Sequence, residues 1–307
     1  MGGDLRGIDV RGIVERLLGG WGPAVGASTS GRIVDAGAVH ERFVRIVHRP
    51  GAVQTEIRIG HVEVPRRIDD FHALSVMGAI LGGLFNSRLN MKLREEKGYT
   101  YGAGAGFDLR RAAGPFSARA AVNTEVTVPA VADFVAELDR IRDADVTPAE
   151  LAAARDFLVG VFPLRFETPG PVVGALSGLF IHELPDDELA RYRSAIEAVD
   201  AAAVRDAATR RIHADAMAIV LVGDADAFGK DIEAAGFGPV DDRAGRGTGR
   251  GGPCPVGARP RCGRSTRVPR ARPRAPTSRA ATRPTRRRPS RSRRGHRRHL
   301  TTALETV

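Results

Sequence analysis

The spacing of apolar residues divides the chain into a short first segment, a long patterned middle and a tail without periodicity. Apolar residues at helical spacing between Ile8 and Leu18 predict one short helix, which ends at a pair of glycines. Residues 23–40 are rich in Gly, Ser and Ala and predict a linker. Because one helix cannot bury its apolar face alone, we expect residues 1–22 to be the remnant of a preceding domain.

From residue 41 the pattern alternates between strand-like and helical segments. Strand-like runs come in two pairs, separated by helical spacing that runs from Phe71 towards Gly98, and one fully apolar run follows near the end. This order predicts an α+β domain over residues 41–240, with helices packed on one face of a mainly antiparallel sheet. The predicted strands cover residues 43–47, 52–59, 101–109, 115–122 and 216–222.

Several helix starts are marked by their first residues. Thr147, Pro148 and Glu150 form a capping box, in which the threonine oxygen and the glutamate carboxylate satisfy free N–H groups of the first turn. Thr168, followed by a proline, predicts a second helix start of the same kind, and Asp200 predicts a third N-cap.

The net charge of +11 is unevenly distributed along the chain. Residues 241–307 hold 20 of the 47 basic and 3 of the 36 acidic residues, a net charge of +17, while residues 1–240 carry −6. The tail consists mainly of Arg, Pro, Gly, Ser, Thr and Ala, and this composition predicts disorder. It is either a basic arm that binds nucleic acid without sequence preference, since its arginines lack interleaved aromatics, or an unselected extension.

Composition also bears on the compartment. The two cysteines, Cys254 and Cys262, both lie in the tail, so no disulfide framework supports the patterned middle. No charged-then-apolar leader opens the sequence, and no apolar run reaches the ~20 residues that span a bilayer. We therefore expect a cytoplasmic protein that does not bind membranes.

The most informative motif extends from a glycine pair to a tyrosine. Residues 82–89 read GGLFNSRL, residues 93–98 read LREEKG, and Tyr101 follows. Further short motifs come after it in order, at residues 123–125, 147–150, 167–169 and 184–187. From about residue 41 to 237, this series resembles the second, zinc-free half-domain of the insulinase-type (M16) peptidases.

The resemblance implies a role for two residues. In that family the second half-domain supplies an arginine and a tyrosine, seven residues apart, which hydrogen-bond the substrate backbone; here they match Arg94 and Tyr101. The ordinary interpretation is that the helix dipole favours an arginine such as Arg94 in the last turn of a helix capped by Gly98, and that Tyr101 simply begins a strand. Tyr99 also lies nearby, at a spacing of five.

Zinc is not expected in this chain. The first half-domain of the family carries the metal motif H-x-x-E-H, and none of the eight histidines here forms it or H-E-x-x-H. We interpret each histidine as a surface or structural residue, and the spacing of Cys254, Cys262, His296 and His299 matches no zinc module. No G-x-S-x-G or P-loop motif is present, and the glycines of residues 102–106 indicate close backbone packing.

The sequence therefore predicts the non-zinc, peptide-binding half of an M16-like metallopeptidase, inactive alone. Its expected partners are an H-x-x-E-H-bearing half that holds zinc, a peptide substrate and, in a homodimer, a second copy of the chain. The sequence assigns no catalytic residue to this half. A scaffold or assembly role for the same fold, and nonspecific nucleic-acid binding through residues 241–307, remain as alternatives. The discriminating observation is peptide binding by the chain.

Overall fold

The computed structural model describes residues 3–22 and 39–241. Helix α1 (Val10–Leu18) lies in the first stretch, where the Asp9 side chain caps it by accepting a hydrogen bond from the N–H of Gly12. The predicted tail, apart from residue 241, and nearly all of the predicted linker fall outside the described residues.

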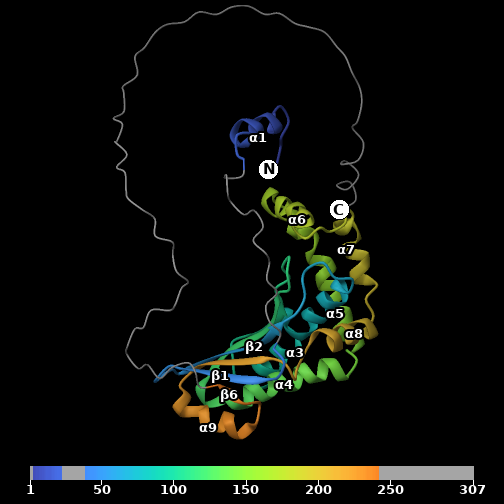
Figure 1. Ribbon diagram of the computed structural model, residues 1–307. Helices are drawn as coiled ribbons and strands as arrows, with labels where there is room; N and C mark the ends of the chain where they lie inside the picture. The colour runs from blue at the N-terminus through green and yellow to red at the C-terminus, as the bar shows by residue number, and fades with distance from the viewer. Residues whose placement is uncertain (1–2, 23–38, 242–307) are drawn as a thin grey trace, which may run out of the picture. The chain divides into compact units, whose positions relative to one another are not determined.

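The second stretch is built on a six-stranded sheet with strand order β3-β4-β2-β5-β1-β6 (Figure 1). Three neighbouring pairs are antiparallel, and β1 pairs in parallel with both β5 and β6. Strand β5 therefore lies between β1 and β2, although these two are consecutive in sequence. The bounds are β1 Phe43–His48, β2 Gln54–Val62, β3 Ala103–Phe107, β4 Pro115–Asn123, β5 Ala218–Gly223 and β6 Val240–Asp241. The predicted α+β class with a mainly antiparallel sheet is confirmed.

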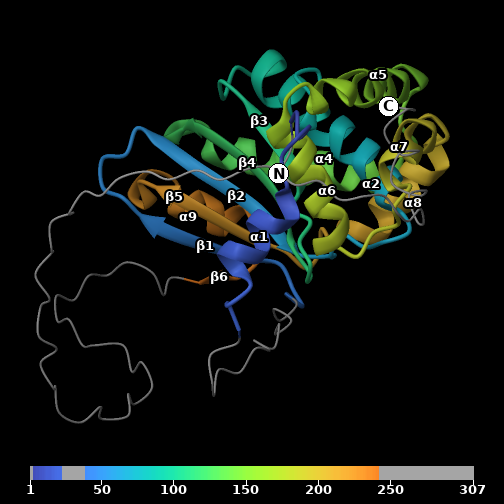
Figure 2. The same cartoon turned by 90° about the horizontal axis from the view of Figure 1, so that it is seen from above.

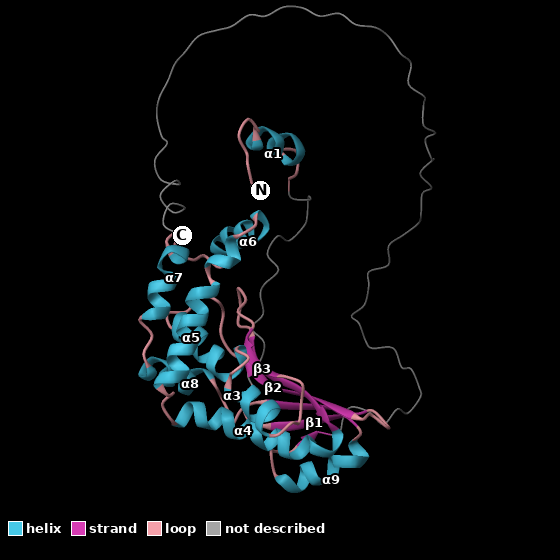
Figure 3. Cartoon of the chain, turned by 180° about the vertical axis from the view of Figure 1, so that it is seen from behind, coloured by secondary structure: helices cyan, strands magenta, loops and turns pink. Residues whose placement is uncertain are grey.

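The two faces of the sheet differ sharply. Alternate residues of β2 are buried, from Thr55 to His61, while the residues between them are exposed or half-buried. Strand β4 alternates in the same way, with Phe116 and Val122 on the buried side. Helices α4 and α9 lie against this buried side (Figure 1, Figure 3), so the predicted one-sided helix layer is confirmed.

The helices form one continuous core with the buried sheet face. Phe134, Leu138 and Ile141 of α4 are completely buried in it, as are Ile196 of α7 and Ile232 of α9. The α-helices are α2 Phe71–Gly78, α3 Arg88–Asn90, α4 Thr127–Asp143, α5 Pro148–Val161, α6 Pro169–Ile181, α7 Glu188–Glu197, α8 Ala201–Arg211 and α9 Ala225–Ala235. Two π-helical segments, η1 Ala79–Gly83 and η2 Met91–Glu96, and two 3₁₀ segments, η3 Thr124–Val126 and η4 Pro163–Phe166, complete them.

The helical pattern predicted from Phe71 to Gly98 is interrupted. Leu84 is extended, and the chain resumes helical geometry only at Arg88. The side chain of Asn90 holds this break: its Nδ2 donates to the carbonyl of Leu84 (3.2 Å), and its Oδ1 accepts from the N–H of Ala103 (2.8 Å). Phe85, which continued the predicted apolar stripe, is consequently 66% exposed.

A glycine allows the break to pack against the edge strand. A Cβ at Gly82 would lie 2.1 Å from the backbone nitrogen of Ala105 in β3, so no larger residue fits there. This close approach agrees with the interpretation of the glycine-rich segment as a site of tight backbone packing.

The predicted helix starts differ in outcome. The capping box at Thr147 and Glu150 is present, and Asp200 caps α8 by accepting from the N–H of Ala203. Thr168 precedes α6 but makes no capping hydrogen bond with its side chain, contrary to the prediction. The third residue of α6 is Pro171, which has no N–H for a threonine to accept from.

Candidate functional site

Arg94 lies in the π-helical segment η2, directly after the interrupted helix. Its guanidinium rests over the Phe85 ring, with Cζ 4.5 Å from the ring centroid, and its Nε is 3.4 Å from Glu95 Oε1. The side chain is 37% exposed. The N–H groups of a guanidinium point outward in its own plane. When the guanidinium stacks on an aromatic face they stay free, so Arg94 retains donors for a ligand.

Tyr101 and Tyr99 have opposite surroundings. Tyr99 packs against the hydrophobic core, whereas Tyr101 is 93% exposed, two residues before β3. Exposure on this scale leaves the Tyr101 hydroxyl available to a ligand, and the partly buried ring of Tyr99 fulfils a packing role. Of the two tyrosines, Tyr101 is by far the more exposed.

A tight turn joins the two predicted binding residues. Gly98 adopts a left-handed conformation (φ 65°), and its N–H donates to the carbonyl of Arg94 (3.1 Å). The N–H of Tyr99 then donates back to the carbonyl of Leu93 (2.8 Å). The predicted helix end at Gly98 is confirmed, and the chain between Arg94 and Tyr101 is held by backbone hydrogen bonds at its centre.

The other arginine of the motif is structural. Arg88 is 7% exposed, and its Nε and Nη2 donate to the two carboxylate oxygens of Glu150 at 2.7 and 3.1 Å. Burial opposes ionisation of this carboxyl, but the Arg88 guanidinium and the Thr147 N–H outweigh it and lower the pKa of Glu150 to about 2. The pair therefore fastens the interrupted helix to the start of α5.

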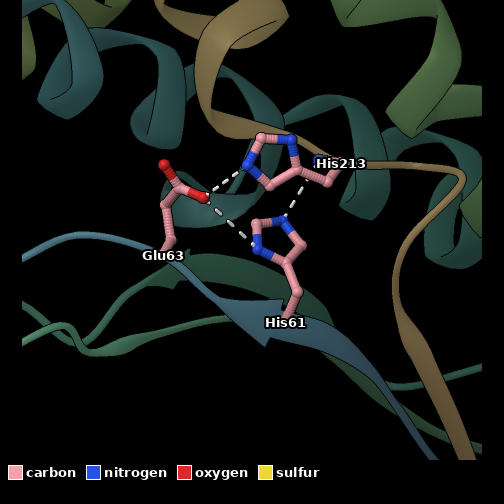
Figure 4. Close-up of side chains that lie close together, drawn as sticks. All are labelled: His61, Glu63 and His213. Carbon is pink, nitrogen blue, oxygen red and sulfur yellow. Dashed lines mark hydrogen bonds and ion pairs between the residues drawn. The ribbon is translucent and has the colours of Figure 1, made fainter. Parts of the chain in front are cut away.

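His61 and His213, each predicted to be an isolated surface or structural residue, meet Glu63 beside strand β2 (Figure 4). His213 Nε2 lies 2.7 Å from Glu63 Oε2, and His61 Nδ1 lies 3.6 Å from the same oxygen. His61 and Glu63 follow each other at strand spacing, which places them on one face, but no local signal links them to His213. Their types and proximity are those of a possible metal site.

The hydrogen bonds within this group do not fit a metal. The backbone N–H of His213 donates to His61 Nε2 (3.2 Å), so the proton of the neutral ring belongs on Nδ1, facing the Val62 carbonyl at 3.2 Å. A metal held by Nδ1 would move that proton to Nε2, against the N–H of His213. Arg211 Nη1, 3.4 Å from Glu63 Oε1, adds a fixed positive charge. These hydrogen bonds leave His61 without a free nitrogen for zinc.

Burial gives the same group unusual acid–base properties. It lowers the pKa of His61 to about 4; the Val62 carbonyl opposes this shift and the neighbouring His213 adds to it. Burial also raises the pKa of Glu63, against the effects of His213 and Arg211. His61 is thus neutral at physiological pH, as its acceptor role requires.

In a second group of possible metal ligands, His48, Asp224 and Asp226, ligand atoms likewise already make hydrogen bonds within the protein. His48 Nδ1 accepts a hydrogen bond from the N–H of Ala225 (3.0 Å), and Asp224 caps helix α9.

Among the described residues, no helix is long and apolar enough to cross a bilayer.

The sequence profile of the family described as Peptidase M16 inactive domain matches residues 2–158, about half of the chain. The chain belongs to this family. The match includes the interrupted helix, Arg94, Tyr101 and the Arg88–Glu150 pair. The expected relation to the second half-domain of the M16 peptidases is confirmed, and the family is the one described as the inactive domain.

Solved structures share the M16 fold. A peptidase M16 inactive domain from Pseudomonas fluorescens is 24% identical, with a TM-score of 0.60 over 66% of this chain and 47% of that chain. A protease from Helicobacter pylori is 17% identical, with a TM-score of 0.65 over 72% of this chain and 54% of that chain. The M16 inactive domain therefore spans about half the length of these structures. No curated protein matches it.

Proposed function

We propose that this M16 inactive domain is the peptide-binding half of a metallopeptidase whose zinc is held by a partner half carrying H-x-x-E-H. The observation that supports the proposal most directly is the contrast between the two tyrosines. Tyr99 packs against the core, while Tyr101, at the spacing of seven from Arg94, is 93% exposed. An exposed phenol before an edge strand contributes little to folding, which leaves it free to contact another molecule.

The proposed roles follow from the chemistry of the two side chains. The Arg94 guanidinium offers several fixed N–H donors, and the Tyr101 hydroxyl can donate one hydrogen bond and accept others. Both suit the carbonyl groups of an extended peptide, which they would hold in place while the partner half carries out hydrolysis. Support of Arg94 by the Phe85 ring limits the freedom that the side chain loses on binding.

Helix α6 supports the need for a partner. Its sequence, PGPVVGALSGLFI, contains no charged residue, and none of its residues is buried. Phe180 is 86% exposed and Ile181 55% exposed, near the end of a helix that extends beyond its neighbours (Figure 3). A contiguous apolar helix surface of this kind is typical of a protein–protein contact, and we propose that the zinc-bearing half covers it.

The proposal is tested by reconstitution. The full chain is mixed with an M16 half that carries H-x-x-E-H, and cleavage of a quenched fluorescent peptide is followed. We expect cleavage to require both chains, and Arg94→Ala and Tyr101→Phe each to lower kcat/KM about tenfold, the loss of one good hydrogen bond to substrate. Arg193→Ala, at an exposed site on α7, is the matched control and leaves the rate unchanged. Full activity in both site variants would contradict the roles of Arg94 and Tyr101.

A scaffold function is the second candidate, because one structural neighbour belongs to a large assembly. A chain of the complex III2 structure from Candida albicans, with Inz-5 bound, has a TM-score of 0.52 and 12% identity, covering 64% of this chain and 49% of that chain. If this function holds, the chain binds its partner half through α6 but binds no peptide. Phe180→Asp then abolishes assembly, while Tyr101→Phe has no measurable consequence.

A further inference from the structure

A row of arginines crosses the open face of the sheet. Arg58 of β2 stands in register with Arg119 of β4 on one side and with Val220 of β5 on the other. Val220 in turn stands in register with Arg45 of β1, so these side chains share one face. Figure 2 looks onto this side of the sheet. Arg45 is itself in register with Asp241 of β6, and the argument rests on Arg58 and Arg119.

Two arginines directly opposite each other repel. Side chains at such positions approach closely, and like charges there destabilise a sheet. Arg58 has a long contact with Glu56 (Nη2 to Oε2 3.4 Å), and each of these two side chains is half exposed. Within the described part of the chain Arg119 has neither a hydrogen bond nor an ion pair. The pair therefore costs folding free energy, and nothing within the described fold compensates for Arg119.

The two arginines line a hollow of about 380 Å³. Glu56 and the backbone of Gly82, Gly102 and Gly104 also line it, and Gly104 stands in register with Arg119. Glycines leave room for another main chain to approach. Gly102 directly follows Tyr101, so the hollow adjoins the exposed tyrosine of the proposed peptide site.

We propose that Arg58 and Arg119 form a subsite for a carboxylate of the bound peptide, supplied by an acidic side chain or by the peptide C-terminus. This subsite rests on the proposed peptide-binding function and names a preference of that same site. A planar guanidinium matches a carboxylate with two parallel hydrogen bonds, and two of them would share the negative charge. Binding would also remove the repulsion between them, so the subsite is prepared for an anion.

The test measures binding of four short dye-labelled peptides to the full chain by fluorescence anisotropy. The peptides carry an internal glutamate or its neutral isostere glutamine, each with a free or an amidated C-terminus. We expect the preferred carboxylate to improve affinity about fivefold, in the range of an exposed ion pair. Arg58→Gln and Arg119→Gln each remove this preference and leave the affinity of the amidated glutamine peptide unchanged. The peptide pair that responds identifies the source of the carboxylate.

Arg193→Gln is the control, because it removes one exposed arginine of α7 and retains the preference. Equal affinity for all four peptides, with binding still dependent on Arg94 and Tyr101, overturns the subsite and keeps the proposed function. No binding of any peptide overturns both. A single-stranded oligonucleotide that binds through Arg58 and Arg119 more tightly than every peptide also overturns the carboxylate assignment.

Discussion

The covered and open faces of the sheet differ in the kind of residue they carry, and strand β2 alone shows the difference. On β2, Ile57 and Ile59 are completely buried against the helices, while Glu56 and Arg58, which alternate with them, are exposed. The covered face is apolar and close-packed, and its residues stabilise the fold. The open face holds opposed like charges beside a hollow, an arrangement that weakens the fold and suits recognition. Adjacent residues of one strand are thus expected to serve different purposes.

The largest expected effect comes from the covered face. Ile57→Ala removes a buried side chain and leaves a cavity, so we expect the free energy of unfolding to fall by about 3 kcal/mol. Arg58→Ala, one residue further along β2, is the matched control and is expected to change it by less than about 0.5 kcal/mol. Urea denaturation of both variants provides the measurement. A similar loss in the two would remove the distinction between the faces.

A second comparison uses the two arginines of the motif. Arg88→Met leaves Glu150 without its buried partner, and we expect a loss of about 2–3 kcal/mol in unfolding free energy. Arg94→Met is expected to cost less than about 0.5 kcal/mol, because its side chain is 37% exposed, and to reduce peptide binding instead. Denaturation and anisotropy on the same samples separate the two effects. Stable Arg88→Met protein would contradict the structural role of the Arg88–Glu150 pair.

The pH dependence of stability tests the buried histidine. Because the pKa of His61 is lowered from 6.5 to about 4, the unfolded chain binds the proton more tightly than the folded one. The contribution of His61 is therefore complete above pH 6.5 and is lost as the pH falls towards 4, by about 3 kcal/mol. The raised pKa of Glu63 acts in the opposite direction.

His61→Gln isolates this effect, since its amide oxygen can still accept from the His213 N–H. We expect the drop in unfolding free energy between pH 7 and pH 5 to be smaller in the variant than in the native chain, as measured by urea denaturation at each pH. Parallel curves for the two proteins would show that His61 does not titrate with a lowered pKa.

The smallest expected effect has the opposite sign. Arg119→Gln relieves the repulsion with Arg58, so we expect the free energy of unfolding to rise by about 0.2–1 kcal/mol. Added salt screens exposed charges, and the gain should shrink at high ionic strength. Arg193→Gln again serves as the control, and thermal unfolding in low and high salt gives the measurement. A less stable Arg119→Gln variant would mean that Arg119 has a favourable role in the free protein.

The sequence predicted much of the fold because its signals are local. Alternation and apolar runs located five strands to within a few residues, and the Thr147 capping box was recognisable from its residue types alone. The interruption at Leu84 escaped prediction because it depends on Asn90 and Ala103, which meet only in three dimensions. Phe85 accordingly left the core, although its spacing was helical.

The sequence by itself determined the α+β class and the family, and it singled out Arg94 and Tyr101 as candidates, since each of these depends on residue types at short spacing. Only the tertiary structure distinguished the exposed Tyr101 from the packed Tyr99, joined Arg88 to Glu150, and brought His213 to His61. It also aligned Arg58 with Arg119, which lie far apart in the chain. These contacts depend on strand register and on the arrangement of helices, which no local pattern encodes.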